Sequence, residues 1–228
     1  MTSTNAVGVD ACARGWVAVA LTGTGVERVW FGTDLASLLG DVAQGTTIGI
    51  DLPLGGVATG WRTADLAARR MLGAQGSSVF LVPPRPVWDE DDYAAANARC
   101  RDLTGQGLSR QAYGLVRRML EAEEFRDTSG HHVIEVHPEL VFRALASGPL
   151  PYRKKTWNGQ MTRRPLLAGV GVMLPDELAE AGHVPADDVL DAAAVAWCAF
   201  QVATGSSRHV PDPADQHDHR DRPIVIHY

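Results

Sequence analysis

Two carboxylates end two similar apolar segments of the chain. Asp10 follows Val7-Gly8-Val9, and Asp51 follows Ile48-Gly49-Ile50. Short segments of this kind are typical of buried strands, so each acid is expected at the exposed end of its strand. Acids in such positions either cap the turn that follows the strand or supply oxygen ligands to a hard divalent cation.

A third group of acids, Asp187, Asp188 and Asp191, opens a long apolar segment near the C-terminus. Asp188 and Asp191 are three positions apart and would project from one face of a first helical turn. Acids in a first turn also stabilise the helix through its dipole, and Asp187 is expected to do so. If these acids meet Asp10 and Asp51, their mutual repulsion favours a bound cation, and Mg²⁺ or Mn²⁺ is the predicted cofactor.

Glu135 is a further candidate ligand. It lies in a predicted strand between Ile134 and Val136, where a buried carboxylate needs a partner. That partner is either the metal or an arginine, and the sequence leaves both open. A zinc site is disfavoured, because His132 and His137 would face opposite sides of the same strand.

The elements that must position these acids begin with a meander. Strands are predicted at 6–10, 15–21 and 26–31, with tight turns between them, so neighbouring strands are antiparallel. A helix over 35–43 and the strand that ends at Asp51 come next. A crossover of this kind favours parallel pairing, most simply with the first strand.

The rest of the chain is predicted to alternate between helices and short strands. Residues 52–130 are interpreted as a mainly helical insertion, with a short extended segment over 77–85 that Pro83 and Pro84 terminate. The tail, residues 211–222, is predicted to be loose. Helices are expected at 62–73, 90–103, 109–125, 138–147, 162–173 and 187–203, and strands at 132–137 and 223–228.

This order predicts an α/β fold for a single domain over residues 1–228, with a mixed sheet flanked by helices. Three antiparallel strands, a helix and then parallel strands resemble the ribonuclease H-like architecture. In that architecture the tips of the first and fourth strands are neighbours, and a late helix begins against the same edge. Asp10, Asp51 and the Asp188/Asp191 pair would meet there.

Composition sets limits on the setting and the partners. The 228 residues carry a net charge of −6, which argues against broad, non-specific nucleic-acid binding but leaves a local basic groove open. No stretch reaches the ~18 apolar residues of a membrane span, and Met1–Asn5 lacks a signal-peptide pattern. Three scattered cysteines without a CxxC motif favour a reduced, cytoplasmic setting.

Several short blocks stand out along about residues 7–228: Val7–Asp10, Arg14–Trp16, Ile50–Gly55, Ser77–Phe80, Pro83–Arg85, Leu108–Tyr113, Glu135–Glu139, Lys154–Thr156 and Asp187–Ala192. In this order the blocks resemble the family called domain of unknown function 429. The resemblance implies a ribonuclease H-like fold and a predicted nuclease.

By analogy with ribonuclease H-like enzymes, the resemblance implies metal ligands on the first strand, the fourth strand and the late helix. These are Asp10, Asp51, and Asp188 or Asp191. Ribonuclease H itself also carries an acid on its first helix. In this chain the predicted first helix, 35–43, offers only Asp41, near its far end. Either Glu135 takes the place of the first-helix acid, or the site holds a single metal ion.

Several polar residues in the family-like blocks are candidates for binding substrate. They stand on predicted loops or at a helix start, where a side chain contacts either phosphates or only solvent. These candidates are Arg85, Arg110, Gln111, Lys154 and Lys155.

Three functional hypotheses follow. The leading one is a Mg²⁺- or Mn²⁺-dependent nuclease that hydrolyses phosphodiester bonds of nucleic acid. The alternative is a non-catalytic module of the same fold that binds nucleic acid or a protein partner. The third is a phosphotransferase of the actin-like or sugar-kinase type, for which Thr22–Gly25 is one phosphate-loop candidate and a second similar half is lacking.

Overall fold

A computed structural model describes residues 5–23 and 25–228 of the chain. Met1–Thr4, part of the segment considered for a targeting signal, and Thr24, in the turn predicted after the second strand, lie outside the described residues. The described chain forms two compact units. The sheet unit comprises the described residues up to Leu52 with 125–208 and 227–228, and the helical unit comprises 53–124 and 209–226.

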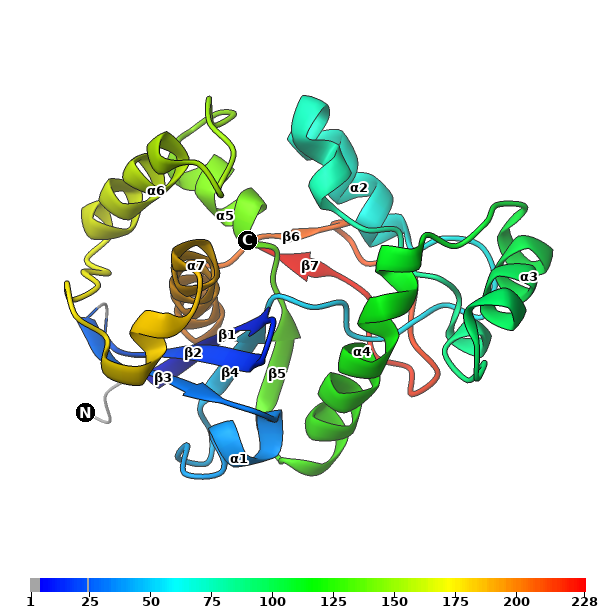
Figure 1. Cartoon of the computed structure of the whole chain (residues 1–228), viewed down its shortest axis with the longest axis horizontal. Helices are drawn as coiled ribbons and strands as arrows, with labels where there is room; N and C mark the ends of the chain where they lie inside the picture. Colours follow the sequence, from blue (N-terminus) through cyan, green and yellow to red (C-terminus); the bar gives the residue numbers. More distant parts are fainter. Residues whose placement is uncertain (1–4, 24) are drawn as a thin grey trace. The chain divides into compact units, whose positions relative to one another are not determined.

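The sheet unit is built on a five-stranded mixed sheet with the order β3-β2-β1-β4-β5 (Figure 1). The first three strands form the predicted antiparallel meander, and β4 pairs in parallel with β1, as expected. β5 extends the parallel part of the sheet beside β4. The strands are β1 (Asn5–Cys12), β2 (Gly15–Thr22), β3 (Gly25–Gly32), β4 (Thr47–Ile50) and β5 (His132–Glu135).

The late helix α7 (Ala186–Ala203) lies directly on this sheet, as Figure 1 shows. Its contact face is made of small side chains, and Ala192 and Ala196 are fully buried. A methyl group on Gly8 of β1 would lie 2.0 Å from the amide nitrogen of Ala196 and 2.2 Å from the carbonyl oxygen of Ala192. The backbone of α7 therefore touches the backbone of β1, which only glycine at position 8 permits.

Three shorter helices complete the sheet unit: α1 (Leu35–Leu39), α5 (Pro138–Leu145) and α6 (Trp157–Gly169), with a 3₁₀ turn, η3 (Ala179–His183). The helix predicted over 35–43 ends at Leu39. The helix predicted over 162–173 instead starts at Trp157, because the Thr156 hydroxyl accepts a 3.1 Å hydrogen bond from the Gly159 amide and caps it.

The helical unit contains α2 (Thr63–Leu72), α3 (Tyr93–Thr104) and most of α4 (Arg110–Thr128), whose last residues belong to the sheet unit. Two 3₁₀ turns lie between α2 and α3: η1 (Gly73–Ser78) and η2 (Arg85–Val87). The extended segment predicted from residue 77 is therefore wrong at its start, where η1 continues to Ser78.

The tail predicted to be loose is hydrogen-bonded into the helical unit. The Gln216 side chain accepts a 2.8 Å hydrogen bond from the Thr63 amide, and the buried Asp218 carboxylate accepts a 2.7 Å bond from Arg222. The polar composition predicts a loose tail, but in the structure these polar groups form hydrogen bonds with each other and with Thr63. The last predicted strand shrinks to β7 (Ile226–His227), which pairs with β6 (His209–Val210).

In the part of the chain that the structure describes, no helix is both long enough and apolar enough to cross a membrane.

Gly8→Ala is expected to separate α7 from β1 and to lower the free energy of unfolding by about 1–3 kcal/mol, as overpacking of a core does. Chemical denaturation followed by circular dichroism measures this change. The matched control is Gly169→Ala in α6, where no described atom lies within 4 Å of the added methyl. That control should stay within about 0.5 kcal/mol of the wild type. Equal losses in both variants would contradict the proposed contact.

Candidate metal centre

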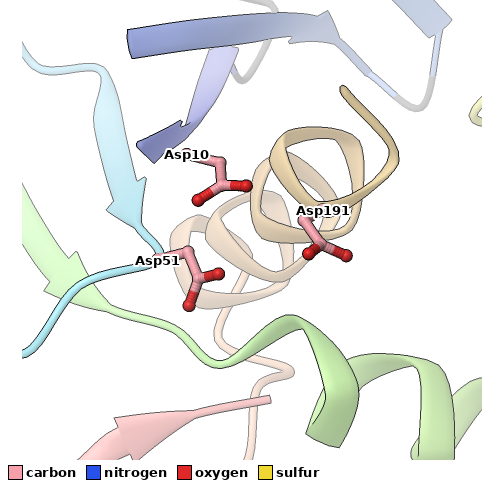
Figure 2. Close-up of side chains that lie close together, drawn as sticks. All are labelled: Asp10, Asp51 and Asp191. Carbon is pink, nitrogen blue, oxygen red and sulfur yellow. The ribbon is translucent and has the colours of Figure 1, made fainter. Parts of the chain in front are cut away.

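Three carboxylates meet at one edge of the sheet unit. Asp10 extends from β1, Asp51 directly follows β4, and Asp191 lies in the second turn of α7 (Figure 2). One ligand oxygen from each lies within 4.8 Å of the others. Oxygen atoms this close can all bind one cation at ordinary metal–oxygen distances, so the three residues could hold a metal ion.

The register of the sheet places the first two acids side by side. Val9 and Ile50 are partners in the parallel pairing of β1 with β4, so the next residues, Asp10 and Asp51, are neighbours at the carboxyl ends. The Asp51 amide donates a 2.9 Å hydrogen bond to the Val9 carbonyl and continues the ladder to the acid itself. The carboxyl ends of parallel strands are where ligands of open α/β sheets bind.

The third acid is brought in by helix packing. Asp191 precedes Ala192, whose carbonyl faces Gly8, and Gly8 lies two residues before Asp10 on the same face of β1. The close contact of α7 with β1 therefore fixes how near Asp191 comes to Asp10. Asp191 has no exposed surface.

The two other candidate acids lie next to this group without belonging to it. Asp188 is half-buried, one turn earlier in α7, and Glu135 ends β5 opposite Ile50 in the parallel register. Both repel the ionised form of Asp51 and so contribute to its raised pKa. They form an outer acidic layer around Asp10, Asp51 and Asp191.

Burial and mutual repulsion make the three carboxyls hard to ionise. Burial is the largest cause for each of them, and repulsion among the acids adds to it. The pKa of Asp51 rises to about 7 and that of Asp191 to about 8, while the pKa of Asp10 is raised well above its usual value. A divalent cation would remove this repulsion and return the three groups to their ionised form.

Lys154 supplies the one positive charge that the structure places on this group. Its ammonium donates a hydrogen bond to Asp191 Oδ2. Burial disfavours the charged ammonium, but attraction to Asp191, Asp51 and Asp10 outweighs burial and raises the lysine pKa. The ammonium therefore stays charged.

The donor set fits a hard divalent ion. Three ionised carboxylates and one ammonium sum to −2, which one divalent cation balances. Among the described residues, the other oxygen of Asp191, Oδ1, is buried and has no hydrogen-bond partner. A buried carboxylate oxygen without a partner is costly, and a bound cation would supply the missing interaction.

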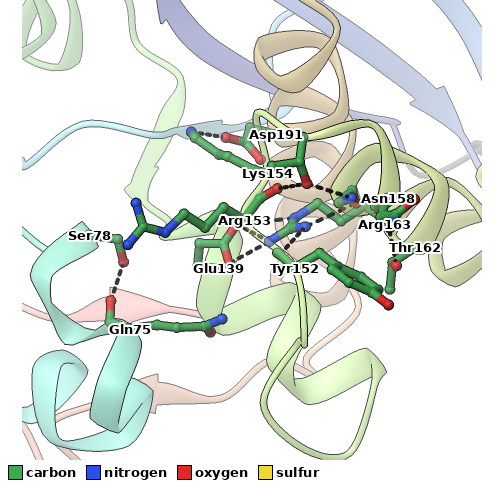
Figure 3. Close-up of polar contacts among 12 residues, drawn as sticks. Gln75, Ser78, Glu139, Tyr152, Arg153, Lys154, Asn158, Thr162, Arg163 and Asp191 are labelled. Atoms are coloured by element: carbon green, nitrogen blue, oxygen red, sulfur yellow. Dashed lines mark hydrogen bonds and ion pairs between the residues drawn. The ribbon is translucent and has the colours of Figure 1, made fainter.

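A buried ion pair holds the segment that carries Lys154. The Arg163 side chain in α6 donates to both oxygens of Glu139 in α5, at 2.7 and 2.8 Å. It also donates to the carbonyl of Tyr152 (3.2 Å), as Figure 3 shows. A further hydrogen bond goes to the carbonyl of Gly159 (3.0 Å). One buried guanidinium thus joins α5, α6 and the loop between them.

Gly159 completes this support. A methyl group at Gly159 would lie 1.9 Å from the carbonyl oxygen of Arg153, so the loop packs against the first turn of α6. Because Arg153 adjoins Lys154, the same contact sets the position of the lysine. From sequence alone, Glu139 is expected only to complement the charge of a helix start, and no local pattern points to Arg163.

The family model described as "Protein of unknown function (DUF429)" matches residues 8–216. The chain belongs to this family. No curated protein and no solved structure matches it. The matched range includes most of both units and all three carboxylates of the candidate centre in this DUF429 chain.

The remaining predicted substrate-binding residues of the DUF429 chain lie in both units. Lys155 is exposed on the loop beside Lys154. Arg85 lies in the helical unit, where it pairs with Glu123 (3.3 Å) and Asp89 (2.8 Å). Arg110 and Gln111, also in the helical unit, are exposed at the start of α4, and the Arg110 guanidinium covers the ring of Tyr93 at 4.4 Å.

Arg163→Met is expected to lower the free energy of unfolding by about 3–5 kcal/mol, because Glu139 would stay buried without its charge partner. Denaturant titration measures the loss. The matched control is Arg164→Met, which removes a surface pair with Asp176 and should cost less than about 1 kcal/mol. Adding Glu139→Gln to Arg163→Met should recover part of the loss, and a larger combined loss would contradict the pairing.

The raised pKa values predict how the metal-free protein responds to pH. The pKa values of Asp51 and Asp191, about 7 and about 8, exceed the ordinary 3.8, so the folded chain holds more protons than the unfolded chain between about pH 4 and about pH 8. The free energy of unfolding should therefore fall as the pH rises from about 4 to about 8. Thermal unfolding across this pH range measures the trend.

Added Mn²⁺ should reverse that trend, because the metal binds ionised carboxylates and displaces their protons. Its stabilising effect on thermal unfolding is expected to be larger at pH 8 than at pH 5. Asp191→Asn is expected to remove most of this difference. An equal Mn²⁺ effect at both pH values would show that the ion binds elsewhere.

Proposed function

We propose that this chain is a Mg²⁺- or Mn²⁺-dependent phosphodiesterase that hydrolyses nucleic acid, on a ribonuclease H-like fold. The observation that carries the proposal is the convergence of Asp10, Asp51 and Asp191 at the carboxyl ends of two neighbouring parallel strands. The strand order β3-β2-β1-β4-β5, with a late helix on the sheet, supports the fold part of the proposal.

In this proposal the three carboxylates hold the metal, and each residue near them has a separate task. A bound divalent ion supplies activation of water and stabilisation of the leaving oxygen in phosphodiester hydrolysis. Lys154 offsets part of the negative charge, so that a phosphate can approach the acidic edge. Asp188, half-buried beside the group, is placed to accept a proton during hydrolysis, and burial and the neighbouring Asp187 raise its pKa above the ordinary value.

The absence of an acid from α1 supports a reduced ligand set. Asp41, the acid expected from the first-helix pattern, lies beyond the end of α1 and is exposed. With the charge of −2 left by three carboxylates and Lys154, a single divalent ion is the simplest occupancy. Glu135, which ends β5 opposite Ile50, is the candidate ligand for a second ion that enters with substrate.

One observation favours a second candidate, the non-catalytic module. The Lys154 ammonium already pairs with Asp191, so the site is partly neutralised without a metal. In that case the lysine takes the structural place of an ion.

The free, buried state of Cys12, Cys100 and Cys198 supports a reducing, cytoplasmic setting for either candidate.

Asp10→Asn is expected to lower Mn²⁺-dependent cleavage of branched, hybrid or single-stranded substrates by at least about 100-fold, because one ligand of the ion is lost. Gel assays measure the cleavage rate, and calorimetric titration measures the binding of Mn²⁺. Asp41→Asn, which removes an exposed carboxylate outside the site, is the matched control and should be unaffected. Cleavage that persists in Asp10→Asn, or a wild type that binds no Mn²⁺, would rule out the proposed centre.

A further inference from the structure

The segment that supports Lys154 also exposes large apolar side chains. Among the described residues, the exposed ones are Tyr152 (46 %), Trp157 (72 %), Met161 (41 %) and Met173 (71 %). Three of them fall within residues 152–161. Trp157 and Met161 are four positions apart in α6, so they share one side of the helix. Three large apolar side chains exposed within ten residues of chain indicate a contact surface.

This stretch differs in charge from the rest of the chain. No acidic residue occurs between Glu139 and Asp176, although the whole chain carries −6. Both lysines of the protein, Lys154 and Lys155, lie in this interval. Aromatic side chains among cations suit a polyanion that also has flat apolar faces, which describes nucleic acid.

The stretch is held at the carboxylate group. Lys154 contacts Asp191, and Trp157 is three residues later, so their Cα atoms lie within about 11 Å. The Thr156 cap, the Gly159 contact and Arg163 all fix the intervening turn. The backbone that carries Trp157 is therefore held close to Lys154, within reach of the nucleotides next to a phosphate bound at the carboxylates.

We propose that residues 152–161, here called the stacking segment, bind single-stranded nucleic acid. Trp157 stacks on an unpaired base, Lys155 contacts the backbone, and the adjoining phosphodiester lies at the carboxylate group. The inference rests on the proposed function and names its substrate class. Single strands are favoured over duplex because an indole needs a free base face, which paired and stacked bases do not offer.

The test measures binding of labelled single-stranded DNA and RNA, each about 12 nucleotides long, and of the matching duplexes, by fluorescence anisotropy. EDTA in the buffer prevents cleavage. Trp157→Ala should weaken single-strand binding on the order of 5- to 100-fold, the effect of losing one base–aromatic stack. Trp157→Tyr should keep most of the affinity. The DNA and RNA samples show which sugar is preferred.

Met173→Ala is the matched control, because Met173 is equally exposed but lies beyond the far end of α6, about 18 Å of helix from Trp157. Its affinity for single strands should equal that of the wild type. An unchanged affinity in Trp157→Ala, or a Trp157-dependent dimer in sedimentation that binds no oligonucleotide, would overturn the inference.

Cleavage and Mn²⁺ titration on the same variants separate this inference from the proposed function. A wild type that cleaves while Trp157→Ala binds single strands normally would overturn the stacking segment alone. A wild type that binds single strands through Trp157 but neither binds Mn²⁺ nor cleaves would support the segment and reject the nuclease.

Discussion

The contact between the backbones of α7 and β1 at Gly8 is the constraint on which the candidate centre depends. It brings one acid of a late helix to two acids at strand ends that are far from it in sequence. The three carboxyls repel one another when ionised, so they would not gather by themselves. The apolar burial along α7, through Ala192 to Ala196, offsets that repulsion, and packing rather than ion chemistry sets the geometry.

A second constraint acts on the loop that carries Lys154. Arg163 is fully buried between Glu139, the loop and α6, and it leaves the loop little freedom. Such a pair contributes specificity more than stability, because removing charge from water is costly. Its effect is to hold Lys154 at Asp191. The acids and the cation are thus positioned by two independent pieces of packing.

Much of the arrangement could be predicted from sequence. Apolar runs that end at Asp10 and Asp51 predicted neighbouring strand ends, because parallel register follows from the crossover. The choice between Asp188 and Asp191 could not be made, since both lie on one helical face and only the packing at Gly8 decides. The early start of α6 was missed because Trp157 and Met161 are exposed and give no buried stripe. The Glu139–Arg163 pair spans 24 positions without any local pattern.

The short path from Lys154 to Trp157 has a thermodynamic consequence. One turn of chain joins a cation that contacts the carboxylates to an indole that faces solvent, and Gly159 and Arg163 keep that turn stiff. A cation that competes with Lys154 for Asp191 would shift the start of α6, and a ligand on the indole would shift the lysine. Binding of a cation at Asp191 and binding of a ligand at the Trp157 indole are then coupled. Each ligand changes the affinity for the other by the same factor.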